Sequence, residues 1–263
     1  MKNWLPILCY HRVCEDEVTP DPLHLCTSTR DLERVLSYLR SHRYRFVSLE
    51  TAIEVLRCGR PPGARYACLT FDDGYRDFYL NAFPLLQKYG ASATVFLVAD
   101  CIGGTNRWDE SYGLPPIPTL SRTEILELDA LSVEFGSHGM GHRRLSTLSD
   151  EERAREISGS KGRLEQLLGH EVRFFCYPFG DQNRDVRAEV RQSGYLGACG
   201  TEQAEHEPFL LHRIDVTRTG WVGTLLRLWG WRHFLQRSRS LRAVKARMLP
   251  ARPAPAGMIE AGR

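Results

Sequence analysis

Short, continuously apolar runs alternate with amphipathic helical segments along most of this chain. Strands that are apolar on both faces are typical of a parallel sheet covered by helices, because such a sheet has no face in water. Six or seven strands of this kind predict a closed or nearly closed α/β barrel, in which chemistry gathers at the carboxyl ends of the strands. The predicted strands fall within eight segments, at residues 4–13, 44–49, 64–71, 92–99, 133–142, 172–181, 195–201 and 209–216.

Serine caps and glycine mark the ends of the predicted helices. Ser28 can cap a helix that runs to about residue 42. A helix over residues 77–90 is expected to end at Gly90 and, because of Pro84, to start late or to be kinked. Capping-box spacing opens two further helical patterns, at Ser121 with Glu124 and at Ser149 with Glu152.

We expect a single barrel domain over residues 1–217, a basic helical segment over 218–249 and a disordered Pro- and Ala-rich tail over 250–263. The net charge of the 263-residue chain is only +3, but no acidic residue lies between Asp215 and Glu260. The positive charge is therefore concentrated in the C-terminal part of the chain.

The basic C-terminal segment has two interpretations. Trp221, Leu225, Leu228 and Leu235 recur at helical spacing among arginines, which predicts either a helix packed on the barrel or an amphipathic segment that touches an anionic membrane. The sequence shows no nucleic-acid-binding module, no membrane-spanning stretch and no signal-peptide cleavage site. We expect a cytoplasmic protein, or one peripheral at the inner face of the membrane, that does not bind nucleic acid.

Eight cysteines are scattered along the chain without a C-x-x-C pair, and several lie inside apolar runs. This usage is typical of small buried hydrophobic residues in a reducing compartment. We therefore expect free thiols and no disulfide framework.

Polar residues with catalytic or metal-binding potential gather at the predicted strand ends. In a barrel these ends meet around one mouth, so residues far apart in the sequence are expected to share a site. The residues concerned are His11, Asp72, Asp73, His138, His142, the segment 177–180 and the segment 212–215.

Two of these groups together indicate a metal centre. His138 and His142 have the H-x-x-x-H spacing of two ligands of one metal, and Gly139 and Gly141 between them favour a tight loop. A carboxylate from the D-D-G sequence at 72–74 would complete a His₂Asp set with room for water, as in catalytic zinc sites. Since adjacent strand residues point to opposite faces, one aspartate can bind the metal while the other acts as general base.

The order of three motifs resembles that of a known family. T-F-D-D-G at 70–74, S-H-x-x-x-H at 137–142 and Y-P-F-G at 177–180 are similar to the motifs of the polysaccharide deacetylases with NodB-homology domains, carbohydrate esterase family four. The opening I-L-C-Y-H-R-V resembles the branch that deacetylates exopolysaccharides rich in N-acetylglucosamine. The resemblance covers about residues 5–217 and implies a distorted (β/α)₇ barrel and a divalent metal, usually zinc.

The resemblance also implies roles for individual residues. Asp73, His138 and His142 would bind the metal, and Asp72 would be the base that activates the metal-bound water. Tyr177 and Phe179 would contact the substrate and the oxyanion, most directly through the backbone N–H of Phe179.

Two positions depart from the family pattern. Cys176 stands where relatives have an arginine that orients the base, so Arg213 is a candidate to replace that arginine. The late histidine motif that supplies the general acid is not evident. His11 is the first candidate for this role and His212 the second.

These observations predict a hydrolase of non-peptide C–N bonds that removes acetyl groups from N-acetylated sugars in a polysaccharide or glycolipid. Two alternatives stay open. The chain could deformylate or deacetylate a lipid-linked amino sugar or another amide, or it could be a catalytically weak carbohydrate-binding relative.

Overall fold

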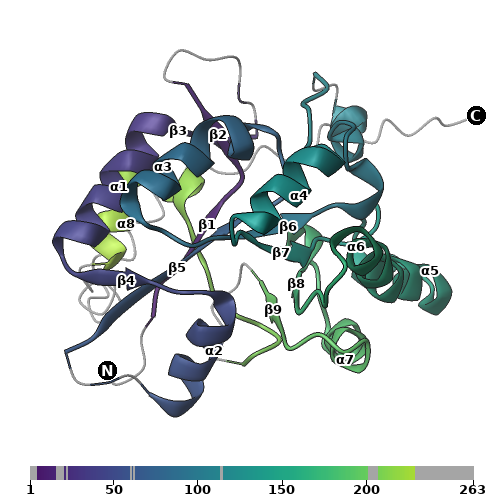
Figure 1. Ribbon diagram of the computed structural model, residues 1–263. Helices are drawn as coiled ribbons and strands as arrows, with labels where there is room; N and C mark the ends of the chain where they lie inside the picture. Colours follow the sequence, from purple (N-terminus) through teal and green to yellow (C-terminus); the bar gives the residue numbers. More distant parts are fainter. Residues whose placement is uncertain are drawn as a thin grey trace, which may run out of the picture. The chain divides into compact units, whose positions relative to one another are not determined.

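The computed structural model describes residues 5–15, 21, 23–59, 61, 63–112, 115–200 and 207–228. Its centre is an eight-stranded parallel sheet with the strand path β10-β1-β5-β6-β7-β8-β9, and β4 pairs with the first half of β5 (Figure 1). The strands are β1 (Ile7–Tyr10), β4 (Tyr44–Phe46), β5 (Arg65–Phe71), β6 (Thr94–Leu97), β7 (Glu134–Ser137), β8 (Phe174–Cys176), β9 (Gly197–Cys199) and β10 (Ile214–Asp215).

The sheet curls into a distorted barrel, as the apolar runs predicted, and the last described strand segment completes it. Leu211 donates its N–H to the carbonyl of Ala198 in β9 (2.9 Å), and three residues later Ile214 pairs with Leu8 of β1. One extended segment therefore joins the two ends of the strand path. His212 and Arg213 lie where it changes partner. They precede β10, whereas the sequence led us to expect them at the end of a strand.

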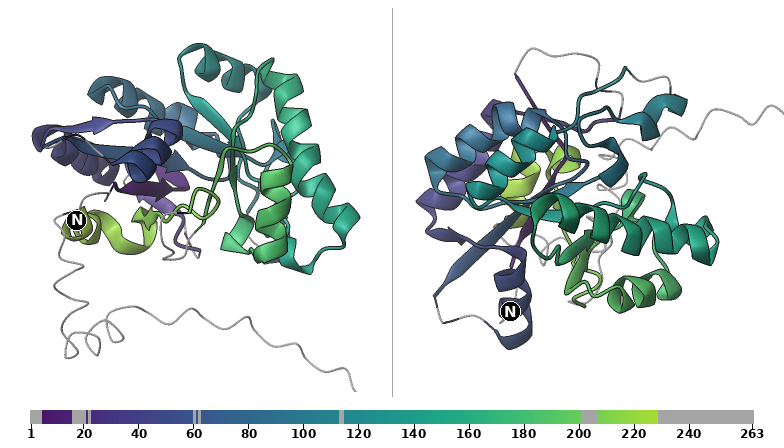
Figure 2. Two further views of the ribbon diagram at one scale, coloured as in Figure 1. Left: turned by 90° about the horizontal axis from the view of Figure 1, so that it is seen from below. Right: turned by 45° about the vertical axis from the view of Figure 1, so that its right-hand side comes forward.

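Helices cover the outer face of the curled sheet (Figures 1 and 2). The α-helices are α1 (Thr29–Ser41), α2 (Leu49–Cys58), α3 (Phe83–Tyr89), α4 (Arg122–Ala130), α5 (Asp150–Ala154), α6 (Ser160–Leu168), α7 (Arg184–Gln192) and α8 (Val216–Leu228). Short 3₁₀ turns are η2 (Ala99–Cys101), η3 (Arg107–Tyr112), η4 (Leu145–Thr147) and η6 (Pro178–Gly180), and π-helical turns are η1 (Phe78–Ala82) and η5 (Arg155–Gly159).

The predicted helix ends are confirmed. Ser28 accepts the Asp31 N–H at the start of α1, and both predicted capping boxes are present. Gly90 ends α3 in the left-handed conformation. Pro84 lies at the start of α3, where a missing N–H costs least, and the π-turn η1 precedes it, which confirms a late start for the regular helix.

A small second sheet pairs β2 (Arg12–Cys14) with β3 (Cys26–Ser28). In it Cys14 and Cys26 form a disulfide, with Cα atoms 6.0 Å apart, so the expectation of free thiols is wrong for these two residues. The other six cysteines are free. The pairing depends on the register of β2 against β3, which cysteine spacing alone does not reveal.

One compact unit comprises Met1–Thr224, and a second begins at Leu225. Of the predicted basic segment over 218–249, only residues up to 228 are described, as part of α8, which is kinked at Gly220. The remainder of that segment and the predicted tail over 250–263 lie outside the described residues. Among the described helices, none has both the length and the apolar character that a membrane span requires.

Candidate metal-dependent active site

Polar side chains that follow three strands meet at the carboxyl ends of the barrel strands. His11 follows β1, Asp72 and Asp73 follow β5, and His138 follows β7 and leads into the loop that carries His142. The turn after β5 brings both aspartates to the mouth, because Asp73 adopts a left-handed φ of 70° and Gly74 one of 63°. A side chain on Gly74 would also lie 2.7 Å from Leu97 Cδ2, so this turn requires glycine.

Three buried ligand atoms form a set of metal-binding size. Oδ1 of Asp73 lies 3.3 Å from Nε2 of His138 and 3.3 Å from Nε2 of His142. Oxygen and nitrogen ligands about 2.1 Å from a tetrahedral zinc ion lie about 3.4 Å from each other. The donor types and their separations therefore fit a small divalent cation.

The surroundings of the three ligands support the same fit. Nδ1 of His138 lies 2.8 Å from the carbonyl of Cys176, which fixes the proton on Nδ1 and leaves the Nε2 lone pair facing Asp73. Oδ1 of Asp73 is buried and has no hydrogen-bond partner among the described residues. Burial lowers the pKa of His142, which favours the neutral ring that a metal needs. A cation would satisfy the otherwise unpaired carboxylate oxygen.

Asp72 is paired with the guanidinium of Arg213. The guanidinium donates from one nitrogen to Oδ1 and from the other to Oδ2, each at 2.7 Å, and both side chains are buried. Burial alone would raise the pKa of Asp72, but the charge and hydrogen bonds of Arg213 lower it to about 2. Asp72 is thus held ionised and fixed in orientation at the mouth.

Cys176 and Arg213 are in direct contact. One guanidinium nitrogen of Arg213 lies 3.1 Å from Sγ of Cys176, and the side chain also reaches Oγ1 of Thr70 at 3.1 Å. The small Cys176 side chain leaves room for an arginine that enters from the β10 side of the barrel. The structure therefore places Arg213 where the sequence suggested a replacement for the missing arginine.

His11 is the histidine beside Asp72. Its Nε2 lies 3.9 Å from Oδ2 of Asp72, and its side chain is 20% exposed, so it borders both the carboxylate and the opening. His212 is partly buried and directly precedes Arg213, whose buried side chain points into the barrel. The geometry favours His11 over His212 as the group that can exchange a proton near Asp72.

Tyr177 does not occupy the position expected for a substrate contact. Its ring is buried, its hydroxyl donates to the carbonyl of Phe209 (2.9 Å), and its N–H donates to the carbonyl of Cys199 (3.2 Å). Both donors are used within the body of the protein. Phe179 instead lies at the mouth, with a left-handed φ of 59° and its ring centroid 4.5 Å from that of His142.

A buried carboxylate that the sequence did not indicate holds the metal-ligand loop. Oε2 of Glu156, in the π-turn η5, accepts the N–H groups of Met140 and Gly141, each at 3.0 Å. A side chain on Gly139 would lie 2.9 Å from the same oxygen. H-x-x-x-H with two glycines predicted a tight loop, but nothing in the sequence pairs that loop with Glu156.

The long loop after β6 also borders the site. The Trp108 ring lies 4.9 Å from that of His142 and 6.1 Å from that of Tyr75, between centroids. Asp109 in the same loop is buried and accepts a hydrogen bond from Asn106 (3.1 Å). The loop thus adds an aromatic wall beside the metal ligands.

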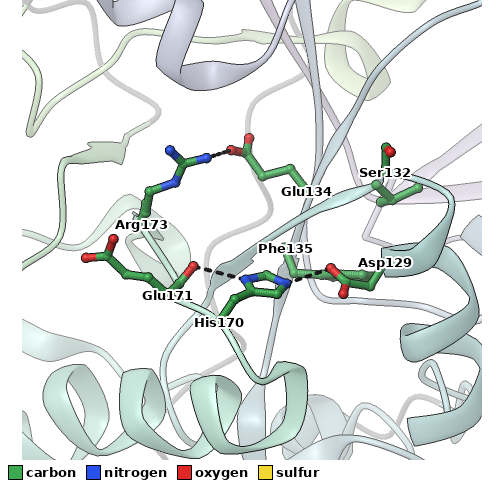
Figure 3. Close-up of a pocket in the computed structure, with 8 residues that line it drawn as sticks. Asp129, Ser132, Glu134, Phe135, His170, Glu171 and Arg173 are labelled. Carbon is green, nitrogen blue, oxygen red and sulfur yellow. Dashed lines mark hydrogen bonds and ion pairs between the residues drawn. The ribbon is translucent and has the colours of Figure 1, made fainter.

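A polar cavity of about 420 Å³ lies at the opposite ends of the strands (Figure 3). Its lining lies at the start of β7 and just before β8 and includes the pair His170–Asp129, with Nε2 and Oδ1 2.9 Å apart. Arg173 lies 3.7 Å from Glu134 across the same cavity. In barrels this face supports stability and the carboxyl face supports chemistry, so we place the candidate site at the mouth.

Comparison with known proteins agrees with this geometry. A family model described as polysaccharide deacetylase matches residues 59–198. The Bacillus subtilis protein YxkH is 25% identical over 217 residues, covering 81% of this chain and 71% of that protein. A Staphylococcus epidermidis protein named poly-beta-1,6-N-acetyl-D-glucosamine N-deacetylase is 25% identical over 209 residues, covering 73% of this chain and 71% of that protein.

Solved structures share the fold. The Streptococcus pyogenes deacetylase PplD superposes with a TM-score of 0.71 at 24% identity, over 86% of this chain and 98% of that one. IcaB from Ammonifex degensii superposes with a TM-score of 0.69 at 24% identity, over 84% of this chain and 94% of that one.

Proposed function

This chain belongs to the polysaccharide deacetylase family, and we propose that it hydrolyses the acetamide of N-acetylated sugars in a polysaccharide or glycolipid. One observation carries the proposal. Beside a His₂Asp set with the separations of zinc ligands stands a second carboxylate, Asp72, that Arg213 keeps ionised. A metal-ligand carboxylate next to a free base is the pair of groups that metal-assisted amide hydrolysis needs.

Asp73, His138 and His142 would hold a divalent cation, and their mixed nitrogen and oxygen donors favour zinc. A cation bound there supplies positive charge that polarises the amide carbonyl and lowers the pKa of water. Glu156 is a positioning residue for this set, because its carboxylate fixes the loop between the two histidines.

Asp72 is the proposed general base and accepts the proton of the attacking water. Arg213 orients the carboxylate through two hydrogen bonds and leaves Oδ2 facing His11. As the C–N bond breaks, His11 donates a proton from Nε2 to the departing amine, so that acetate and a free amino sugar leave. His11 suits this step because it is partly exposed beside Asp72.

The backbone N–H of Phe179 is the proposed donor to the oxyanion that develops on the acetyl carbonyl. The left-handed backbone at this residue sets the Y-P-F-G turn against the metal-ligand loop, as the contact between Phe179 and His142 shows. Trp108 and Phe179 offer apolar faces at the opening, which suits the flat face of a sugar ring.

Acetate release from β-1,6-linked N-acetylglucosamine oligomers tests the proposal, since one relative is named for that polymer. We expect release that stops with a chelator and returns with Zn²⁺. Asp72→Asn should keep the metal and lose about 10²–10⁴-fold in turnover. Asp73→Asn should lose the metal, and Asp150→Asn, whose side chain is 95% exposed, serves as control.

Two outcomes contradict the proposal. If Asp72→Asn loses the metal and Asp73→Asn retains it, the roles of the two aspartates are reversed. A zinc-loaded wild type that releases no acetate from N-acetylated sugars rejects the deacetylase activity and leaves a carbohydrate-binding role.

A further inference from the structure

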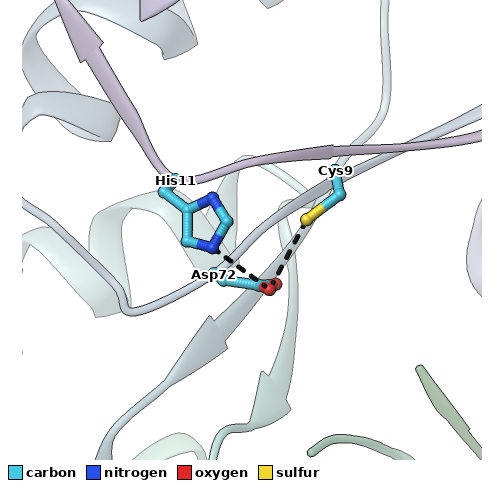
Figure 4. A group of neighbouring side chains, drawn as sticks. All are labelled: Cys9, His11 and Asp72. Atoms are coloured by element: carbon cyan, nitrogen blue, oxygen red, sulfur yellow. Dashed lines mark hydrogen bonds and ion pairs between the residues drawn. The ribbon is translucent and has the colours of Figure 1, made fainter. Parts of the chain in front are cut away.

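A second set of metal-ligating side chains lies on the other side of Asp72. Sγ of Cys9 is 3.5 Å from Oδ2 of Asp72, and Nε2 of His11 is 3.9 Å from the same oxygen. The three ligand atoms lie within 4.8 Å of one another. Figure 4 shows the thiol and the imidazole directed at one carboxylate from the β1 side.

The chain geometry explains this convergence. Cys9 lies in β1, and His11 is the first residue after that strand. The two residues are two positions apart, so both side chains leave the backbone on the same face. Asp72 follows β5, which is hydrogen-bonded to β1 with Cys9 opposite Thr70. The set shares no ligand with Asp73, His138 and His142.

The separations approach those of a tetrahedral zinc or cadmium site. With a sulfur ligand at about 2.3 Å and an oxygen ligand at about 2.1 Å, the two atoms lie about 3.6 Å apart around zinc, and nitrogen and oxygen about 3.4 Å apart. The observed sulfur–oxygen distance of 3.5 Å already fits. The nitrogen–oxygen distance of 3.9 Å requires a small rotation of His11, whose side chain is partly exposed.

The donor set also selects the kind of cation. A thiol, an imidazole and a carboxylate together favour Zn²⁺ and Cd²⁺ over Mg²⁺ or Ca²⁺, which prefer oxygen ligands. Arg213 remains bonded to the same carboxylate, so its positive charge weakens the site relative to the one at Asp73. The second cation should therefore bind only when the metal is in excess.

We propose that Cys9, His11 and Asp72 form a second, inhibitory site for zinc or cadmium. Binding releases the thiol proton of Cys9 to solvent and makes ligands of Asp72 and His11. The inhibitory effect rests on the proposed function, because it removes the proposed base and acid together. The binding itself does not depend on that function.

The test uses Cd²⁺ and two independent readouts. Protein in a Cys58→Ser background, which removes the exposed free thiol, is loaded with one equivalent of Zn²⁺ and then titrated with Cd²⁺. We expect an ultraviolet cadmium–thiolate charge-transfer band and a parallel loss of acetate release. In Cys9→Ser and Cys9→Ala the band should disappear, and the inhibition midpoint should move at least about tenfold to higher Cd²⁺.

Two further thiols provide matched controls. Cys68→Ser changes a buried thiol earlier in β5, and Cys176→Ser changes the other thiol near Asp72, whose Sγ is 3.6 Å from Oδ2. Both should retain the band and the inhibition. Unfolding midpoints of all variants without Cd²⁺ show whether each one folds.

Three results overturn the proposal: no band in the wild type, a band that persists in both Cys9 variants, or a band that requires Cys176 instead of Cys9. A Cys9-dependent band without any inhibition overturns the inhibitory role. Failure of the proposed function is distinguished from all of these, because it appears as no acetate release at one equivalent of Zn²⁺, before Cd²⁺ is added.

Discussion

The two adjacent carboxylates at the mouth of the barrel have different electrostatic partners. Asp72 forms an ion pair with a buried arginine through two hydrogen bonds. Asp73 faces two imidazoles, and its buried Oδ1 has no hydrogen bond among the described residues. Burial would raise the pKa of Asp73, but His138 and His142 hold it well below its usual range. Each carboxylate therefore stays charged for a different reason, and of the two only Asp73 is not bonded to a guanidinium.

Replacement of Arg213 should shift the acid limb of the pH–activity profile to higher pH. The guanidinium opposes the effect of burial on Asp72, so in Arg213→Met the pKa of Asp72 should rise above its native value of about 2. Protonated Asp72 cannot act as a base, so the acid limb of kcat/KM should shift to higher pH. We also expect a loss of at least about tenfold in kcat/KM at neutral pH, measured by acetate release.

Two companion variants sharpen this experiment. Arg213→Lys keeps the charge but not the paired hydrogen bonds, so its acid limb should fall between those of wild type and Arg213→Met. Arg218→Met removes an exposed arginine on α8 that pairs with Asp215, and it should leave the profile unchanged. An unaltered acid limb in Arg213→Met would show that Arg213 does not control Asp72.

At this scale the sequence predicted the proposed ligands better than the residue that supports their loop. D-D-G and H-x-x-x-H bring together Asp73, His138 and His142, because each motif lies at a strand end and strand ends meet in a barrel. The sequence also offered Arg213 as the partner of Asp72, which it contacts, but no pattern pointed to Glu156 beneath the histidine loop. Tyr177 was expected to contact substrate, but its hydroxyl donates a hydrogen bond to the backbone carbonyl of Phe209.

The loop that carries the two histidines depends on a π-helical turn between α5 and α6. This turn, η5, brings the buried Glu156 carboxylate under the N–H groups of Met140 and Gly141. Such turns are rare and often mark functional sites, since the extra residue alters which side chains face inward. Here the turn fixes a loop in which His142 holds a left-handed φ of 61°.

Glu156→Gln should weaken metal binding more than it weakens the fold. The amide offers one acceptor oxygen, and its NH₂ group would oppose the backbone N–H donors of the loop. Loss of this support should lower zinc affinity by about 10–100-fold, as for other groups that orient metal ligands. Competition for Zn²⁺ with a chromogenic chelator measures the affinity directly.

Glu151→Gln, an exposed change in α5, is the matched control and should leave zinc affinity unaltered. If Glu156→Gln retains wild-type zinc affinity, Glu156 does not position the histidines. The variant is informative at any activity level, because the affinity measurement does not require turnover.

The elements themselves followed from local patterns. Serine caps at residues 28, 121 and 149 and the glycine at 90 set helix ends through contacts only a few residues away, so the sequence could specify them. The disulfide between Cys14 and Cys26 depends on strand register, and the π-turn η5 depends on tertiary contacts of Glu156. Local patterns do not contain that information.

Across the barrel, closure and the ion pair at Asp72 depend on the same late segment. Leu211 pairs with β9, Ile214 pairs with β1, and Arg213 between them reaches Asp72. The alternation of strands and helices predicted a barrel. It could not predict that the closing strand changes partner at His212 and Arg213, because that depends on how the two ends of the sheet meet.

Metal removal should destabilise this whole barrel unit, since the proposed ligands follow two different strands, β5 and β7. A ligand that binds only the folded state at about 1,000 times its Kd stabilises that state by about 4 kcal/mol. In a domain of this size about 1 kcal/mol shifts Tm by about 2–4 °C, so chelation should lower Tm by about 10 °C. Asp73→Asn should show no chelator effect, and Asp150→Asn should match wild type. If Asp73→Asn and wild type respond equally to the chelator, the stabilising metal binds elsewhere.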